Sequence, residues 1–254
     1  MKLFMISARA AFVAGLALTG GIVQAGTSFS EGFEGATLAA SGWTTVNRST
    51  SASTLGVWRL GAAIIDSESN PVVLPYAGNQ FAVVSYTSSS SSSSSATLSN
   101  WLLSPVITGL ANGDTFSFFT TTTPASEYPD RLEFRLSTSG SSIDVGTTTT
   151  STGVFSTTLL SVNSGLAVGG YPESWTQYTV TLSGLTAPVD GRVAFRYFVT
   201  NGGPNGVNSN IIGLDNFAYT AAAPIPEPSS YALMLAGVAG LLAWRRRSGG
   251  AAAA

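Results

Sequence analysis

Residues 131–136 read Arg-Leu-Glu-Phe-Arg-Leu, and this short stretch decides the fold class of the chain. Charged and apolar residues alternate throughout it, with Leu132, Phe134 and Leu136 on one side and three charged residues on the other. Because successive side chains of a β-strand point to opposite faces, a period of two predicts a strand with one buried face. We therefore expect the three apolar side chains in a core and the three charged ones on a solvated face.

The same period returns on both sides of this stretch, at Thr115–Phe118, Thr176–Leu182 and Gly191–Val199. Further candidate strands are rich in β-branched and aromatic residues and are separated by Gly, Pro, Asn and Ser. They are Phe29–Phe33, Trp43–Asn47, Val57–Ile65, Phe81–Tyr86, Leu98–Leu103, Thr157–Val162 and Ile211–Tyr219. No segment between the two ends of the chain shows the period of an amphipathic helix. The body is predicted to be all-β, a jelly-roll-like antiparallel β-sandwich spanning residues 26–222.

The first 25 residues have the three parts of a secretory signal peptide. Lys2 and Arg9 supply the positive charge, a short apolar run follows, and Val23-Gln24-Ala25 places small residues before the cleavage point. We expect a signal helix that signal peptidase removes between Ala25 and Gly26. An uncleaved membrane anchor is the alternative, and the shortness of the apolar run speaks against it.

The chain changes character again over residues 223–248. Pro226-Glu227-Pro228 lies in a stiff spacer, Tyr231–Trp244 is almost wholly apolar, and Arg245-Arg246-Arg247 follows, before a tail at 249–254. This order resembles the PEP-CTERM sorting signal, which implies processing by an exosortase near the Pro-Glu-Pro motif. A fourteen-residue helix is about 21 Å long, short of a hydrocarbon core of about 30 Å. We expect transient insertion into the inner membrane, with the arginines on the cytoplasmic side.

Four short motifs in the body also resemble one family. They are Phe29–Gly35, Gly42-Trp43, Asn100–Pro105 and Ile212–Phe217. Together they resemble the choice-of-anchor J domains, relatives of the cleaved-adhesin and MAM-like jelly rolls. The resemblance implies an adhesive or matrix-associated module without assigned catalysis. The family often has a second Asp where this chain has Asn216, which weakens any carboxylate pair there.

Composition excludes several kinds of chemistry. The chain has no Cys and no His, which removes disulfides, thiolate sites, Ser-His-Asp triads and most zinc sites. Five of the eleven basic residues lie in the terminal segments, so the body is acidic and Lys-free, which argues against nucleic acid as a partner. A glycosidase needs only two carboxylates and stays formally open, with Glu31, Glu34, Asp130, Glu133 and Asp215 as candidate acids, of which Glu133 is disfavoured by its arginine neighbours.

Three acidic residues are candidate ligands of a structural calcium ion. In sandwiches of the resembled kind, the first and last strands meet at one edge, which would bring Glu31 and Glu34 near Asp215. Calcium takes six to eight oxygen ligands from carboxylates, amides and backbone carbonyls. The alternative is that these acids are solvated edge residues that discourage pairing with another chain.

Two loops are predicted from composition. The run Ser88–Ser95 has nothing to bury and is expected to be mobile, with O-linked sugar as a further possibility. Asn201–Asn210 is a wide turn rich in Gly and Asn, either an ordinary hairpin connection or a binding loop at the end of the sandwich. Four tryptophans are expected in the core, and any that is exposed beside this turn becomes a candidate for stacking on sugar. These are Trp43, Trp58, Trp101 and Trp175.

The sequence thus predicts a non-catalytic exported protein of the cell surface or extracellular space, working in the polysaccharide matrix after transient inner-membrane anchoring. A carbohydrate-binding, lectin-like domain with exopolysaccharide as its partner is the alternative, and a glycan-degrading enzyme is the third.

Overall fold

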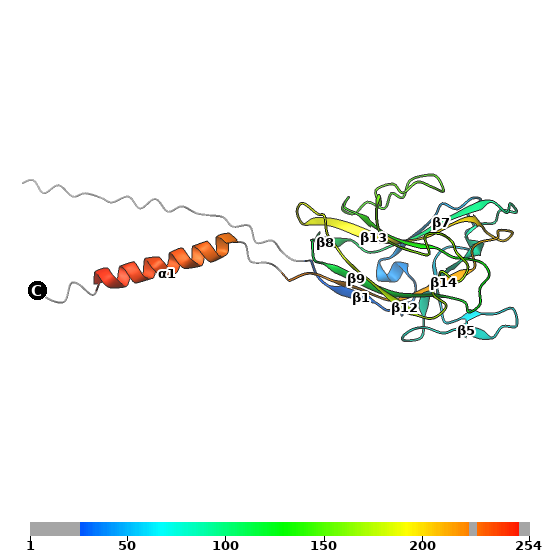
Figure 1. Ribbon diagram of the computed structural model, residues 1–254, viewed down its shortest axis with the longest axis horizontal. Coiled ribbons are helices and arrows are strands. Elements are labelled where there is room, and N and C mark those ends of the chain that lie inside the picture. The colour runs from blue at the N-terminus through cyan, green and yellow to red at the C-terminus, as the bar shows by residue number, and fades with distance from the viewer. Residues whose placement is uncertain (1–25, 224–227, 249–254) are drawn as a thin grey trace, which may run out of the picture. The chain divides into compact units, whose positions relative to one another are not determined.

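A computed structural model describes residues 26–223 and 228–248, and two six-stranded antiparallel sheets make up the body (Figure 1). The first sheet has the order β12 (Thr176–Thr181), β9 (Thr115–Thr122), β14 (Ile211–Thr220), β6 (Phe81–Ser85) and β3 (Arg59–Gly61), with β1 (Phe29–Glu31) also paired to β14. The second has the order β11 (Thr157–Val162), β10 (Leu132–Ser137), β13 (Val189–Gly202), β7 (Ala96–Leu103) and β2 (Thr44–Asn47), with β8 (Ile107–Leu110) also paired to β13. The predicted all-β sandwich is confirmed.

The core lies between the two sheets and consists largely of aromatic rings. Phe118 of the first sheet meets Phe195 of the second with ring centroids 4.9 Å apart, and Phe116 meets Phe134 at 5.5 Å. Leu132, Phe134 and Leu136 are all buried, as the alternation at 131–136 predicts. Each large ring that leaves water adds a few kcal/mol of hydrophobic stabilisation, about 25 cal/mol per Å².

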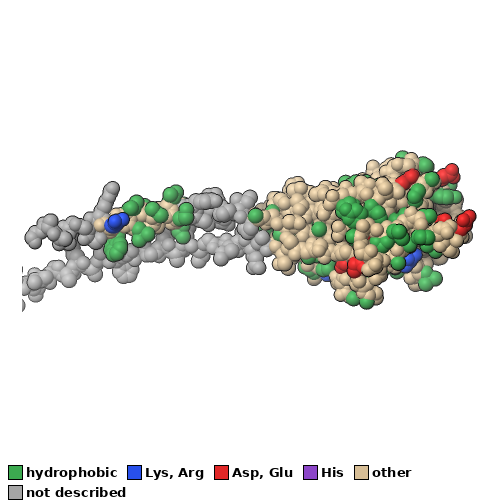
Figure 2. Space-filling model, turned by 90° about the horizontal axis from the view of Figure 1, so that it is seen from below, with side chains coloured by type: hydrophobic (Ala, Val, Ile, Leu, Met, Phe, Trp, Pro, Cys, Tyr) green, Lys and Arg blue, Asp and Glu red, His purple; other side chains and the backbone are tan. Residues whose placement is uncertain are grey.

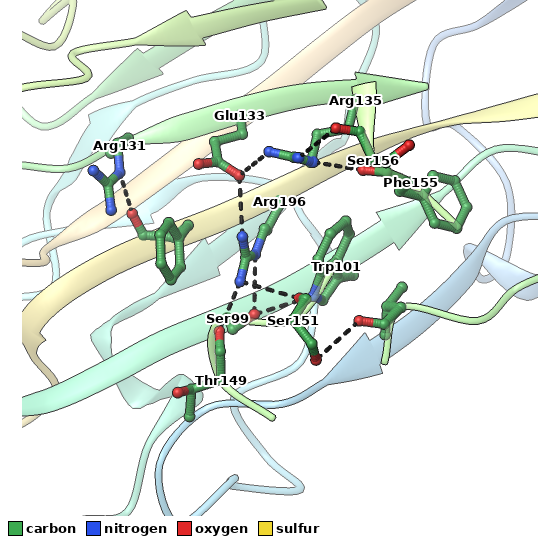
Figure 3. A network of polar contacts seen from close by, with 12 residues as sticks. Ser99, Trp101, Arg131, Glu133, Arg135, Thr149, Ser151, Phe155, Ser156 and Arg196 are labelled. Atoms are coloured by element: carbon green, nitrogen blue, oxygen red, sulfur yellow. Dashed lines mark hydrogen bonds and ion pairs between the residues drawn. The ribbon is translucent and has the colours of Figure 1, made fainter. Parts of the chain in front are cut away.

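The charged face of β10 is not solvated, and this expectation was wrong. Arg135 is 8% exposed and Arg196 on the neighbouring strand β13 is 2% exposed, because the segment 138–156 folds over them (Figure 3). Arg135 donates from Nε to the carbonyl of Phe155 at 2.8 Å, and Arg196 donates from Nη2 to that of Thr149 at 2.7 Å. Glu133 lies between the two guanidinium groups, with its Oε2 2.9 and 3.2 Å from their Nη1 atoms.

The first two residues of the serine run are buried, although its composition predicts nothing to bury. Ser88 and Ser89 are buried, and their hydroxyls donate to the carbonyls of Gly56 at 3.0 Å and Thr50 at 2.5 Å. Gly56 is packed so closely against this turn that a Cβ there would lie 1.8 Å from the carbonyl oxygen of Thr87. The hydroxyls therefore satisfy buried backbone groups, a role that a count of apolar residues does not detect.

Three further differences concern segment boundaries. The predicted strand Val57–Ile65 is divided between β3 of the first sheet and β4 (Ile64–Ile65), which pairs with β5 (Pro71–Val73) in a separate hairpin. The strands β5 and β8 were not predicted. Two 3₁₀ turns occur, η1 (Ala39–Ser41) and η2 (Tyr86–Ser88).

The C-terminal helix α1 spans Pro228–Ser248, seven residues more than the fourteen predicted, and includes the arginines. Within the described parts of the chain, no helix is long and apolar enough to cross a membrane. The predicted signal helix lies outside the described residues.

Candidate functional site

Three connections meet at one end of the sandwich. They are η2, the segment 123–131 between β9 and β10, and the loop 201–210, which comprises the last two residues of β13 and its connection to β14. The pairing register places them together, because Ile211 lies opposite Ser85 and Ile212 lies opposite Thr122. At its other end, β14 pairs with β1, and the body ends there a few residues later.

The loop 201–210 is compact, and left-handed backbone conformations let it turn back on itself. Asn201 has a φ of 51° and Gly203 a φ of 91°, the conformation that Gly and Asn adopt at low cost. The amide of Asn208 donates to the carbonyl of Asn201 at 3.0 Å, and that of Ser209 donates to Pro129 at 3.0 Å. The predicted Asn/Gly turn is thus confirmed and is joined to the segment before β10.

A buried carboxylate holds these connections in place. Asp130 is fully buried, and its Oδ1 accepts the amide of Asn210 at 2.8 Å and the hydroxyl of Tyr197 at 2.5 Å. Its Oδ2 accepts the hydroxyl of Thr122 at 2.8 Å. Burial raises the pKa of Asp130 to about 6, and these hydrogen bonds oppose the rise. One side chain therefore joins the loop 201–210 to both sheets.

Asn210 links this hydrogen-bonded network around Asp130 to the surface. Its Nδ2 donates to the hydroxyls of Thr123 at 2.7 Å and Ser126 at 3.0 Å, and its carbonyl accepts the amide of Tyr86 at 2.7 Å. The backbone that carries Tyr86 and the segment that carries Tyr128 are thus tied to the same residue. Such hydrogen-bonded support is what a preorganised binding surface requires.

Two adjoining clefts of about 810 and 470 Å³ share Tyr86, Tyr128 and Asn210 in their walls. Tyr86 is 41% exposed and Tyr128 is 51% exposed. The larger cleft continues toward Ile65 on the β4–β5 hairpin, and the smaller one toward Asn205. We call this pair of clefts the tyrosine groove. Figure 2 shows hydrophobic and acidic side chains gathered toward one end of the body, while uncharged polar surface covers much of the rest of that view.

None of the four predicted tryptophans lines the tyrosine groove. Trp43, Trp58 and Trp101 are buried in the core, as predicted. Trp175 is half-buried on the outer face of the first sheet, where its Nε1 donates to the carbonyl of Leu74 at 2.8 Å. The two groove tyrosines were missed from the sequence. The sequence prediction placed Tyr86 at the end of the strand Phe81–Tyr86, whereas in the structure it begins η2. Tyr128 lies in the connection between β9 and β10, so no strand pattern marked either ring.

The three predicted calcium ligands bind backbone amides instead of lying as a cluster. Glu34 accepts from Asn79 at 2.9 Å and Gln80 at 3.0 Å, and Glu31 accepts from Phe33 at 2.6 Å. Among the described residues, no three acidic side chains gather closely enough to hold a metal ion.

Asp215 is fully buried in β14 and fastens the segment before β6. Its Oδ2 accepts the amides of Tyr76 at 2.9 Å and Ala77 at 3.2 Å. Burial raises the pKa of this carboxyl. Glu34 and Asp215 thus hold neighbouring parts of one loop. A calcium ion shared by Glu31, Glu34 and Asp215 stays a proposal drawn from the sequence.

The predicted processing sites lie at the edges of what the structure describes. Ala25, Pro226 and Glu227 fall outside the described residues, whereas Gly26 is the first residue of the described body. Pro228 begins α1, and Arg245, Arg246 and Arg247 lie in its last turn.

Comparison with known proteins confirms the predicted sorting motif in the C-terminal tail. Residues 224–247 match the PEP-CTERM protein-sorting motif. The motif marks the chain as an exported protein of the kind that exosortases process. No curated protein has significant sequence similarity to this chain.

Solved structures confirm the predicted resemblance of the body at the level of the fold. The chain is similar to the K1 cleaved adhesin domain of Lys-gingipain from Porphyromonas gingivalis W83, with a TM-score of 0.50 and 22% identity over 78% of this chain and 100% of that one. The K3 domain of the same protein follows with a TM-score of 0.48, 20% identity, and coverage of 76% and 98%. A family 11 carbohydrate-binding module from Clostridium thermocellum has a TM-score of 0.33, 13% identity, and coverage of 82% and 94%.

Proposed function

We propose that this protein is a non-catalytic surface module that binds polysaccharide in the extracellular matrix through the tyrosine groove. The observation that carries the proposal is the pair of exposed rings, Tyr86 and Tyr128, in the walls of two adjoining clefts. Burying large aromatic side chains on binding is favourable, and exposed apolar surface gathered in a concave site is typical of ligand-binding sites.

The groups around the tyrosines suit a sugar chain. A pyranose ring has apolar faces, which pack on aromatic rings, and a rim of hydroxyls, which need donors and acceptors. The side chains of Asn205, Asn210 and Ser126 supply amide and hydroxyl groups along the groove walls. Two adjoining open clefts with these groups fit the interior of a polysaccharide chain better than a small enclosed metabolite.

The position of the groove supports a role at the surface. β14 begins beside the groove at Ile211 and ends at Thr220, and ten residues of strand span about 30 Å. The chain therefore leaves the body toward its sorting motif at the end opposite the groove. A module held through its C-terminal side would present the groove to the matrix.

The acids near the groove are poorly placed for glycosidase chemistry, which favours binding over hydrolysis. Asp130 has the raised pKa of a general acid, yet it is fully buried and its oxygens accept three protein donors. Asp66 lines the larger cleft, but hydrogen bonds from Asn70 and Glu68 lower its pKa, the opposite of what a proton donor needs.

We expect delivery to the surface by way of the sorting motif, with signal peptidase and exosortase as processing partners and transient inner-membrane insertion before the final cut. We expect protein recovered from the native host to begin at Gly26 and to lack residues 231–254. Intact-mass measurement checks both ends. Finished protein that keeps Ala254 would contradict exosortase processing.

Polysaccharide binding is tested by affinity electrophoresis of the full-length protein in gels that contain soluble polysaccharides, including the host's own exopolysaccharide. We expect Tyr86→Ala and Tyr128→Ala each to weaken binding about thirtyfold, because loss of a central aromatic contact costs about 2 kcal/mol. The matched controls Tyr86→Phe and Tyr128→Phe keep the ring faces and should retain most of the affinity.

Melting temperatures separate lost binding from lost folding, since both tyrosines are exposed and should matter little to stability. Retardation by no polysaccharide, or retardation that the double alanine variant leaves unchanged, would overturn the proposal.

A further inference from the structure

Most arginines of the body make hydrogen bonds to the backbone of the fold. Residues 26–222 contain no Lys and six Arg. Five of these arginines donate to backbone carbonyls. These five contacts run from Arg48 to Gly146, from Arg131 to Phe198, from Arg135 to Phe155, from Arg192 to Ser104 and from Arg196 to Thr149. Two of the six arginines, Arg48 and Arg59, are exposed, and the other four are partly or fully buried.

The larger cleft of the groove is itself slightly negative. Arg59, which is exposed, is its one basic lining residue, whereas Asp66 and Glu127 are both acidic. Hydrogen bonds from the Asn70 backbone lower the pKa of Asp66, so this carboxylate is ionised at neutral pH. The smaller cleft contributes no charged side chain.

The net charge of the rest of the body adds to the negative electrostatic potential at the groove. Residues 26–222 contain twelve acidic residues against six Arg, 6 − 12 = −6. Polyanion-binding proteins work in the opposite way, by lining their sites with unpaired Lys and Arg that displace counterions.

We propose that the tyrosine groove selects uncharged polysaccharides and excludes polyanionic ones such as polyuronates. The inference rests on the proposed function and adds the ligand class. A neutral chain can place its rings on Tyr86 and Tyr128 at no electrostatic cost. A chain with a carboxylate on each sugar would bring repeated negative charges within a Debye length, about 8 Å at physiological salt, of Asp66 and Glu127.

The test compares two derivatives of one polymer. The neutral polysaccharide that the full-length protein binds best is either carboxymethylated or hydroxyethylated to the same degree of substitution, so that bulk is matched and charge differs. We expect the carboxymethyl form to bind about tenfold more weakly at 0.15 M salt, a difference of 1.4 kcal/mol. The difference in affinity between the two derivatives should become smaller at 1 M salt, where the Debye length is about 3 Å.

A variant links the selection to the groove. Glu127→Gln removes one exposed negative charge from the groove wall, so it should reduce the difference in affinity between the carboxymethyl and hydroxyethyl forms. Equal or tighter binding of the carboxymethyl form at 0.15 M salt would overturn the inference and leave the proposed function standing. Binding of neither derivative nor of the parent polymer would overturn the proposed function itself.

Discussion

Replacing Glu133 with glutamine is expected to destabilise the protein by about 3–5 kcal/mol, the usual cost of removing one partner from a buried ion pair. Among the described residues, Glu133 is the one carboxylate within ion-pair distance of both Arg135 and Arg196, whose side chains are only 9% and 2% exposed (Figure 3). Burial lowers the pKa of Arg196 to about 10, and Glu133 opposes that shift. A neutral amide would leave two neighbouring cations with no counterion in a poorly hydrated place.

The measurement is thermal unfolding of the wild-type protein and the Glu133→Gln variant. For a body of about 200 residues each kcal/mol corresponds to roughly 2–4 °C, so the melting temperature should fall by about 6–20 °C. Glu127→Gln is the matched control, since this exposed glutamate should change stability by less than about 0.5 kcal/mol. A Glu133 variant that melts within 2 °C of the wild type, on the same scale, would show that the segment 138–156 does not depend on this network.

Replacing Asp130 with asparagine is expected to change how stability depends on pH. The pKa of Asp130 is about 6 in the folded protein and about 3.9 in an unfolded chain. The folded state therefore binds the proton more tightly. The stability that Asp130 contributes is fully present below pH 4 and is lost as the pH rises through 6, a change of about 3 kcal/mol.

Asparagine fits the same site without a charge. Its oxygen can accept from Tyr197 and Asn210, and its amide can donate to Thr122, whose hydroxyl also lies 2.8 Å from the carbonyl of Ile211. Urea unfolding at several values between pH 4 and 7.5 should show the variant gaining about 3 kcal/mol relative to the wild type across that range.

Asp66→Asn is the control, because the pKa of this exposed acid is lowered and its removal should not produce a gain with rising pH. A constant difference between the Asp130→Asn variant and the wild type at every pH would contradict the buried, proton-binding role of Asp130.

Sequence patterns predicted the sheets well, because a strand buried on one face has apolar residues at every second position. The alternation at 131–136 correctly identified Leu132 and Phe134 as core residues. It failed on the opposite face, where Glu133 and Arg135 are covered by a long loop. Binary patterning separates charged from apolar residues, but it cannot detect a third layer whose backbone carbonyls pair with arginines.

The site was harder to predict than the fold. The Asn/Gly turn at 201–210 was recognised as a binding-loop candidate from residues that favour positive φ. Tyr86 and Tyr128 were missed, because they come together only when β6, β9 and β14 pair in register. The sequence correctly predicted that Glu34 and Asp215 lie near each other. It did not predict their contacts to backbone amides, because these depend on a loop with no sequence signature.

The central claim is that the tyrosine groove holds a sugar chain, and the most direct measurement is a crystal structure of the protein with an oligosaccharide cut from the polysaccharide it binds best. The account predicts sugar rings packed on Tyr86 and Tyr128, with Asn210 or Ser126 in hydrogen-bond contact. A second exposed aromatic surface, where Tyr76 stacks on Phe119 with ring centroids 3.7 Å apart, should stay empty. An oligosaccharide seated on Tyr76, with the groove empty, would contradict the account.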